Sequence, residues 1–331
     1  MKAFEYAAPR SEEEALELLA PEPGTSEVLA GGTDLLGLMK KMIVTPSRVV
    51  SLSRVASLKR IDADSQGMRI GAMVTLDDLL AHPATAKYPA LEQALRGFGS
   101  LQMQSQGTLG GELCQRPRCW YFRGGHGLLA ERGRAVAEGD NRFHAIFDNA
   151  GPAKFVSPSR VAPALVALGA TLRVIGPEPG DETQMPLELL YRTPKDERQR
   201  EHDLLPNQVV AQIVLPAADG RRSAAYEVHH GAGGQDDPIV SAAASLTMHG
   251  NIVADARIVL GQVAPTPWTS HEAIRAIVGA PVDQRTAEAA GEAAVSVAAP
   301  LSHNQFKVQL AKVAVKRALL KAAGLQTGGL A

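Results

Sequence analysis

Two glycine turns in this chain have a backbone geometry that suits phosphate binding. The first is Ala30-Gly31-Gly32-Thr33-Asp34 and the second is Gly107-Thr108-Leu109-Gly110-Gly111. Paired glycines let successive backbone N–H groups point into one concavity without interference from Cβ atoms. The hydroxyls of Thr33 and Thr108 could add further donors. Each turn alone is more often a tight turn beside packed strands, so neither decides a function.

Neither turn fits the fingerprint of a common nucleotide-binding fold. Neither contains the dinucleotide pattern G-x-G-x-x-G, and neither contains the P-loop pattern G-x-x-x-x-G-K-[ST]. The sequence therefore does not predict a Rossmann or P-loop domain.

A group of cysteines and histidines raises the alternative of a zinc site. Its members are Cys114, Cys119, His126 and His144. Structural zinc sites usually show tighter paired spacing and a second recognisable pair. We therefore expect no metal on this chain, and we interpret His229-His230 as part of a polar loop.

The elements that must position the first turn alternate between strands and helices. Ser11 and Glu14 form an S-x-x-E capping box, which predicts a short helix after the opening strand. Val28 to Ala30 is a predicted strand that leads into the glycine turn, and Leu35 to Met39 follows as a helix or an extended loop. Other predicted elements are strands at 3–6, 49–52, 58–62 and 68–73, and helices after Thr75 and over 89–98.

The region from Gly107 to Gly151 has no clear periodicity and is rich in Gly, Arg and His. A loop this long inside a compact domain is usually functional or contains a missed element. We expect the aromatic cluster Trp120-Tyr121-Phe122 to anchor this loop, with a partner interface as the alternative. Beyond it the sequence predicts a helix leading into a strand over 163–174, a strand over 209–215, a hairpin of 241–248 with 252–260, and helices within 283–325.

Bulk composition limits the class of protein. The 331 residues, 45% hydrophobic and 21% charged, suggest about two domains of roughly 150 residues each. The net charge of -1 gives no positive field for nucleic acid or an anionic membrane. No apolar run approaches the roughly 20 residues that span a bilayer. Two cysteines suit a reducing compartment, so we expect a cytoplasmic protein, with periplasmic export on a signal-bearing partner as the alternative.

The pair of turns, together with its surroundings, resembles a known family. Val28 to Leu35 resembles the first FAD loop of the flavin subunits of the xanthine dehydrogenase, carbon monoxide dehydrogenase and aldehyde oxidoreductase group of molybdenum hydroxylases. Phe98-Gly99-Ser100-Leu101-Gln102, which leads into the second glycine turn, resembles the second FAD loop. The likeness continues through residues 163–170, 239–243, 255–261, 265–267 and 304–308.

This resemblance implies an α+β fold in two parts. A two-subdomain FAD-binding domain of the vanillyl-alcohol-oxidase/PCMH type would occupy residues 1–220, with an inserted loop at about 112–150. A smaller α+β domain, similar to the C-terminal domain of the CO dehydrogenase flavoprotein, would occupy 221–331. The turn signal at Ala218-Asp219-Gly220 suits this boundary.

The resemblance also implies the role of the chain. FAD would pass electrons from two-iron clusters on a small partner subunit to a final acceptor, while a molybdenum cofactor on a large partner subunit oxidises the substrate. The chain would bind and orient FAD without a catalytic side chain of its own. The implied cofactor-binding residues are Val28, Leu29, Ala30, Gly31, Gly32, Thr33, Asp34, Leu35, Phe98, Thr108, Gly110, Gly111 and Val210, with Val210 near the isoalloxazine ring. The alternatives are an FAD-poor structural subunit and a stand-alone flavin oxidase.

Three positions depart from the family pattern. Glu112 replaces the usual Asn, Arg160 replaces the usual Asp, and Glu227 replaces a frequent Lys. A basic stretch that often follows becomes Val228 to Gly234. Arg160 could pair with Glu112 or with the FAD diphosphate, and a neutral surface substitution is the alternative.

One subgroup of the family carries an extra four-iron cluster in the inserted loop, and two segments of this chain resemble it. These are Cys119 to Arg123 and Asp140 to Ile146. Such a cluster needs four thiolates. Of the expected ligands only Cys119 matches, and no cysteine follows it. We therefore expect the loop without an iron-sulfur cluster.

Overall fold

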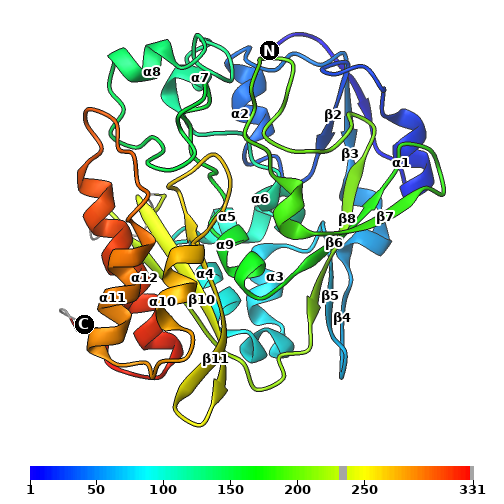
Figure 1. Cartoon of the computed structure of the whole chain (residues 1–331). Helices are drawn as coiled ribbons and strands as arrows, with labels where there is room; N and C mark the ends of the chain where they lie inside the picture. Colours follow the sequence, from blue (N-terminus) through cyan, green and yellow to red (C-terminus); the bar gives the residue numbers. More distant parts are fainter. Residues whose placement is uncertain (231–236, 329–331) are drawn as a thin grey trace.

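A computed structural model of the chain describes residues 1–230 and 237–328, and the strands among them form three sheets (Figure 1). The fold is mixed α+β, as the sequence predicts. The stretch from Val228 to Gly234 departs from the family pattern, and its residues Gly231 to Gly234 lie outside the described residues.

The first sheet holds the strand that leads into the first glycine turn. It has the parallel order β1-β3-β2, with β1 at Glu5–Ala7, β2 at Ser26–Leu29 and β3 at Arg48–Ser51. Helix α1 (Glu12–Leu18) packs against this sheet, and the Ser11 hydroxyl accepts a hydrogen bond from the Glu14 N–H, which confirms one half of the predicted capping box. The Glu14 carboxylate accepts from the Arg10 N–H at 2.7 Å instead of the Ser11 N–H. After the turn the chain forms helix α2 (Leu35–Lys40). Of the two structures predicted there, a helix or an extended loop, the helix is therefore correct.

The second sheet is antiparallel, and residues Val209 and Val210 of this sheet line the same cleft as the first glycine turn. Its order is β4-β5-β8-β6-β7, with the strands at Ile61–Asp64, Gly67–Gly71, Val209–Pro216, Thr171–Ile175 and Glu182–Pro186. Helices in this part are α3 (Leu76–Ala81), α4 (Pro89–Arg96), α5 (Leu101–Gln106), α6 (Leu109–Leu113) and α9 (Ala162–Ala167), with 3-10 turns at Leu52–Arg54, Ala56–Lys59, Pro83–Lys87 and Leu187–Leu190.

Two predictions in this part were wrong. The strand expected from Leu58 begins only at Ile61, because residues 56–59 form a 3-10 turn that buries the Leu58 side chain completely. The second glycine turn ends in helix α6 rather than in a loop. The Thr108 hydroxyl caps this helix by accepting from the Gly111 N–H, so the threonine serves local structure as well.

The third sheet belongs to the C-terminal part of the chain. It is antiparallel in the order β12-β11-β10-β9, with strands at Trp268–Thr269, Ile252–Gly261, Val240–His249 and Arg222–Val228. Strands β10 and β11 confirm the predicted hairpin, and its Gly250 has a φ of +63°. Helices α10 (His271–Ile277), α11 (Gln284–Ala294) and α12 (Phe306–Ala322) pack beside the sheet (Figure 1).

The inserted loop contains two short helices, α7 (Trp120–Arg123) and α8 (Arg134–Glu138). The predicted anchor is confirmed for Phe122, which is buried against Leu38 and Leu129. Trp120 is instead 38% exposed. The buried Lys307 amine donates to the carbonyls of His144 at 3.0 Å and Gln262, which fastens the loop to the C-terminal part. Within residues 1–230 and 237–328 no helix is long and apolar enough to cross a bilayer.

Candidate functional site

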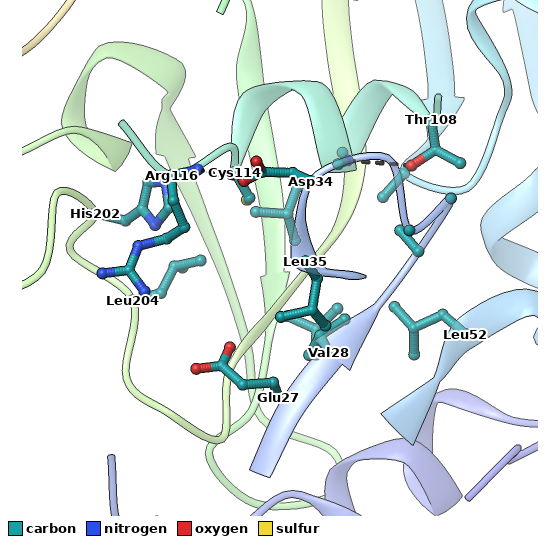
Figure 2. A pocket seen from close by; sticks show the side chains of 18 of the residues that line it. Glu27, Val28, Asp34, Leu35, Leu52, Thr108, Cys114, Arg116, His202 and Leu204 are labelled. Carbon is teal, nitrogen blue, oxygen red and sulfur yellow. Dashed lines mark hydrogen bonds between the residues drawn. The ribbon is translucent and has the colours of Figure 1, made fainter. Parts of the chain in front are cut away.

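A cleft opens between the first sheet and strand β8, and both glycine turns line it (Figure 2). All the predicted cofactor-binding residues line it except Leu29 and Phe98. The predicted residues that line the cleft are Val28, Ala30, Gly31, Gly32, Thr33, Asp34, Leu35, Thr108, Gly110, Gly111 and Val210. Residues as far apart in the sequence as Val28 and Val210 therefore meet at one site.

The first turn requires glycine and presents free backbone donors. A Cβ atom on Gly31 would lie 1.8 Å from the carbonyl oxygen of Gln106, so no other residue fits between the two turns. Gly32 has a φ of +76°, a conformation that side chains disfavour. The amides of Gly32 and Thr33 donate to no acceptor within the described residues. This cradle fits an anion such as a phosphate.

The second turn contributes in a different way from the first. The Gly110 N–H donates to the Ala72 carbonyl at 2.8 Å, and the Gly111 N–H donates to Thr108 Oγ1 at 3.1 Å. These amides are therefore engaged, and the paired-glycine argument fails for this turn. A Cβ atom on Gly110 would lie 2.6 Å from the Ala72 Cβ, so this glycine allows close packing. The Thr108 hydroxyl accepts through its oxygen, which leaves its hydrogen free to donate.

Asp34 fastens the first turn to the inserted loop. Its Oδ2 accepts from the Arg116 N–H at 2.9 Å, and its Oδ1 accepts from Arg123 Nη2 at 2.6 Å. The same Arg123 nitrogen donates to the Arg116 carbonyl at 3.0 Å. The carboxylate of Asp34 thus positions the cradle by holding its neighbours.

One side of the cleft was not predicted from the sequence. It is formed by Arg116 and by the segment from Arg200 to Pro206. Arg116 pairs with the buried Glu201, and Arg200 Nη1 lies 3.4 Å from Glu27 Oε1. Burial acts to raise the pKa of Glu201, but the guanidinium groups of Arg116 and Arg200 hold it below its usual range. No local signal in the sequence identified these residues.

The three departures from the family pattern meet in one buried network. The Arg160 guanidinium donates to both oxygens of Glu227, at 3.2 Å and 2.7 Å, and its own backbone N–H donates to Glu112 Oε1 at 2.8 Å. Its Cζ lies 4.8 Å from the centre of the Phe98 ring. Arg160 is therefore neither a surface residue nor a cleft residue, and its side chain pairs with Glu227 instead of Glu112.

The structure does not assemble the zinc site that was considered as an alternative. Cys119 Sγ lies 3.1 Å from His144 Nε2, whereas His126 contacts Glu131 and Cys114 lines the cleft. Across residues 1–230 and 237–328, no three His, Cys, Asp or Glu side chains gather in a way that could hold a metal ion.

The comparisons with known proteins agree with this site. Residues 2–218 match the family described as the FAD binding domain in molybdopterin dehydrogenase. The chain belongs to this family. Residues 224–322 match the CO dehydrogenase flavoprotein C-terminal domain.

Individual relatives extend over nearly the whole chain. The aldehyde oxidoreductase FAD-binding subunit PaoB of Escherichia coli K12 is 32% identical over 97% of this chain and 99% of its own length. The carbon monoxide dehydrogenase medium chain of Hydrogenophaga pseudoflava is 27% identical over 96% of each. A chain of quinoline 2-oxidoreductase from Pseudomonas putida 86 has a TM-score of 0.75 and 26% identity, and the match covers 98% of this chain and 99% of that chain. These findings place the chain among the FAD-binding subunits of oxidoreductases of the molybdenum hydroxylase type.

Proposed function

We propose that this chain carries FAD in the cleft and passes electrons from two-iron clusters on a small partner subunit to a final acceptor. A large partner subunit with a molybdenum cofactor would oxidise the substrate. The observation that carries this proposal is the meeting of both glycine turns in one cleft whose first turn has free amide donors. Bound FAD supplies the change between two-electron and one-electron transfer.

The diphosphate of FAD is best matched by the first turn. The amides of Gly32 and Thr33 and the hydroxyl of Thr108 offer donors, and hydrogen bonds to a charged acceptor are about twice as strong as neutral ones. Val210 lines the cleft on strand β8, where the flavin ring is expected. Leu29 and Phe98 do not line the cleft, so they would support FAD binding by packing behind the residues that do.

The same proposal includes the domain boundary, the place of the iron-sulfur clusters and the cellular compartment. We place the domain boundary near residue 220, with the FAD-binding domain before it and the smaller domain at 221–331. Iron-sulfur clusters would lie on the partner, because Cys114 and Cys119 offer two thiols where a four-iron cluster needs four. Both cysteines are free, which suits the cytoplasm.

Purification of the complex that forms around the full-length chain tests this function. The expected result is one flavin for each copy of this chain, with molybdenum and two-iron clusters on separate polypeptides. A colourless complex that still contains the molybdenum subunit would support an FAD-poor structural subunit instead. Flavin on a chain that binds no molybdenum subunit would support a stand-alone flavin oxidase.

A further inference from the structure

Arg116 brings a guanidinium group from the inserted loop to the wall of the cleft. Figure 2 shows its side chain on the side of the cleft that also holds His202 and Leu204. The side chain is 15% exposed, and its terminal nitrogens Nη1 and Nη2 donate no hydrogen bond within residues 1–230 and 237–328. Of its three nitrogens, only Nε is both without a hydrogen bond and closed off from solvent. The two terminal nitrogens therefore keep accessible surface that a ligand can reach.

Four contacts hold Arg116 in this orientation. Its backbone N–H donates to Asp34 Oδ2 at 2.9 Å, and its carbonyl accepts from Arg123 Nη2 at 3.0 Å. The guanidinium pairs through Nε with the buried carboxylate of Glu201, and its Cζ lies 5.2 Å from the centre of the Phe122 ring. A side chain that is already fixed loses little conformational freedom when a ligand arrives, so its new hydrogen bonds contribute more to affinity.

The charge of Arg116 and its link to the first glycine turn indicate the kind of group that it binds. Asp34, which holds the Arg116 backbone, ends the turn whose amides at Gly32 and Thr33 are free donors. A guanidinium is permanently charged, and its planar donors match the oxygens of a phosphate. The diphosphate is the charged group of oxidised FAD. Hydrogen bonds between two charged groups are the strongest that this cleft could offer.

We infer that Arg116 donates hydrogen bonds from Nη1 and Nη2 to the diphosphate of bound FAD. The inserted loop is then part of the cofactor site, because it supplies a cationic side chain and holds the first turn through Asp34. The inference rests on the proposed function, since it assumes that FAD occupies the cleft.

The test compares two full-length variants that differ only at Arg116. Arg116→Met alone would leave the buried Glu201 carboxylate unpaired, so the arginine is removed in the Glu201→Gln background. The FAD dissociation constant of the double variant should be roughly tenfold to a hundredfold above that of Glu201→Gln. A ratio under about threefold would overturn the inference.

Arg118→Met is the matched control for charge. It removes a positive charge from the same loop, but Arg118 does not line the cleft and pairs with Asp237. Its FAD dissociation constant should stay within about twofold of wild type. A loss as large as that of the double variant would show that the charge of the loop matters and not a contact of Arg116, which would also overturn the inference.

The phosphorus NMR spectrum of bound FAD identifies the group that Arg116 contacts. It is recorded for Glu201→Gln and for the double variant, each saturated with FAD. At least one phosphate resonance should differ between the two, while the flavin absorption spectrum stays the same. Identical phosphate resonances would overturn the inference whatever happens to the absorption, and the proposed function would stand. If the wild type binds no FAD, the proposed function itself fails.

Discussion

The guanidinium of Arg160 and the carboxylate of Glu227 form a buried ion pair in which Nη2 and Oε2 lie 2.7 Å apart. Their side chains are 4% and 11% exposed. The pair joins the segment before α9 to strand β9, across the proposed domain boundary. Two of the three departures from the family pattern therefore contact each other as one ion pair.

Exchanging the charges of this pair tests whether the two departures compensate each other. Arg160→Asp or Glu227→Lys alone places two like charges beside each other in a buried site, so each should lower the free energy of unfolding by about 3–5 kcal/mol. The double variant should recover most of that loss. Denaturant unfolding of the four proteins measures the coupling, and simple addition of the two losses would contradict it.

The close contact between the glycine turns predicts a specific loss of flavin. Gly31→Ala would place a Cβ atom 1.8 Å from the Gln106 carbonyl, so the turns must separate and the FAD dissociation constant should rise at least about a hundredfold. Gly37→Ala is the matched control, because a Cβ atom there meets nothing within 4 Å. Flavin fluorescence quenching measures both. Equal affinities in the two variants would rule out the cradle.

Glu112 predicts a pH dependence of stability. Burial raises its pKa from 4.5 to about 7, so between these values the unfolded chain releases the proton while the native chain keeps it. The native state then binds more protons, and stability falls as the pH rises through this window. Glu112→Gln keeps an acceptor for the Arg160 N–H and removes the titration. From pH 5 to 7 the wild type should lose on the order of 2 kcal/mol relative to this variant. Parallel stability curves for the two proteins would refute the assignment.

The buried amine of Lys307 predicts a large effect at a residue far from the cleft. Lys307→Met leaves the Gln262 carbonyl without a donor, whereas the His144 carbonyl keeps the one from Asn304 Nδ2 at 3.1 Å, so the free energy of unfolding should fall by about 1–3 kcal/mol. Lys316→Met is the control, because Lys316 forms an ion pair on the surface of α12 with Glu288 and should cost under about 1 kcal/mol. Thermal unfolding compares the two, and similar losses would show that the buried amine does not fasten the loop.

Sequence patterns predicted the elements whose signals are local. Capping chemistry identified the helix after Ser11, and the apolar runs on either side of Gly250 identified the hairpin. Strand β9 was missed because its partly exposed residues lack strict alternation, and α6 was missed because two glycines disfavour a helix. The helices predicted within 283–325 are separated by residues 295–305.

The site was predicted only in part for a physical reason. Its glycine turns need backbone conformations and close contacts that favour glycine, so the residue types themselves indicate them. The other side of the cleft depends on Arg116 and the Arg200–Pro206 segment, which reach it through tertiary packing alone. The same reason hid the partner of Arg160. Glu227 was flagged as unusual, but nothing in its neighbours along the chain indicated the contact.

The most direct test of the central claim is the amount of FAD bound by the purified full-length chain and by Gly31→Ala. The account predicts that denatured wild-type protein releases FAD equimolar with the polypeptide, and that the folded variant releases almost none. Wild-type protein without flavin, or a variant with as much flavin as the wild type, would contradict the claim that this cleft binds FAD.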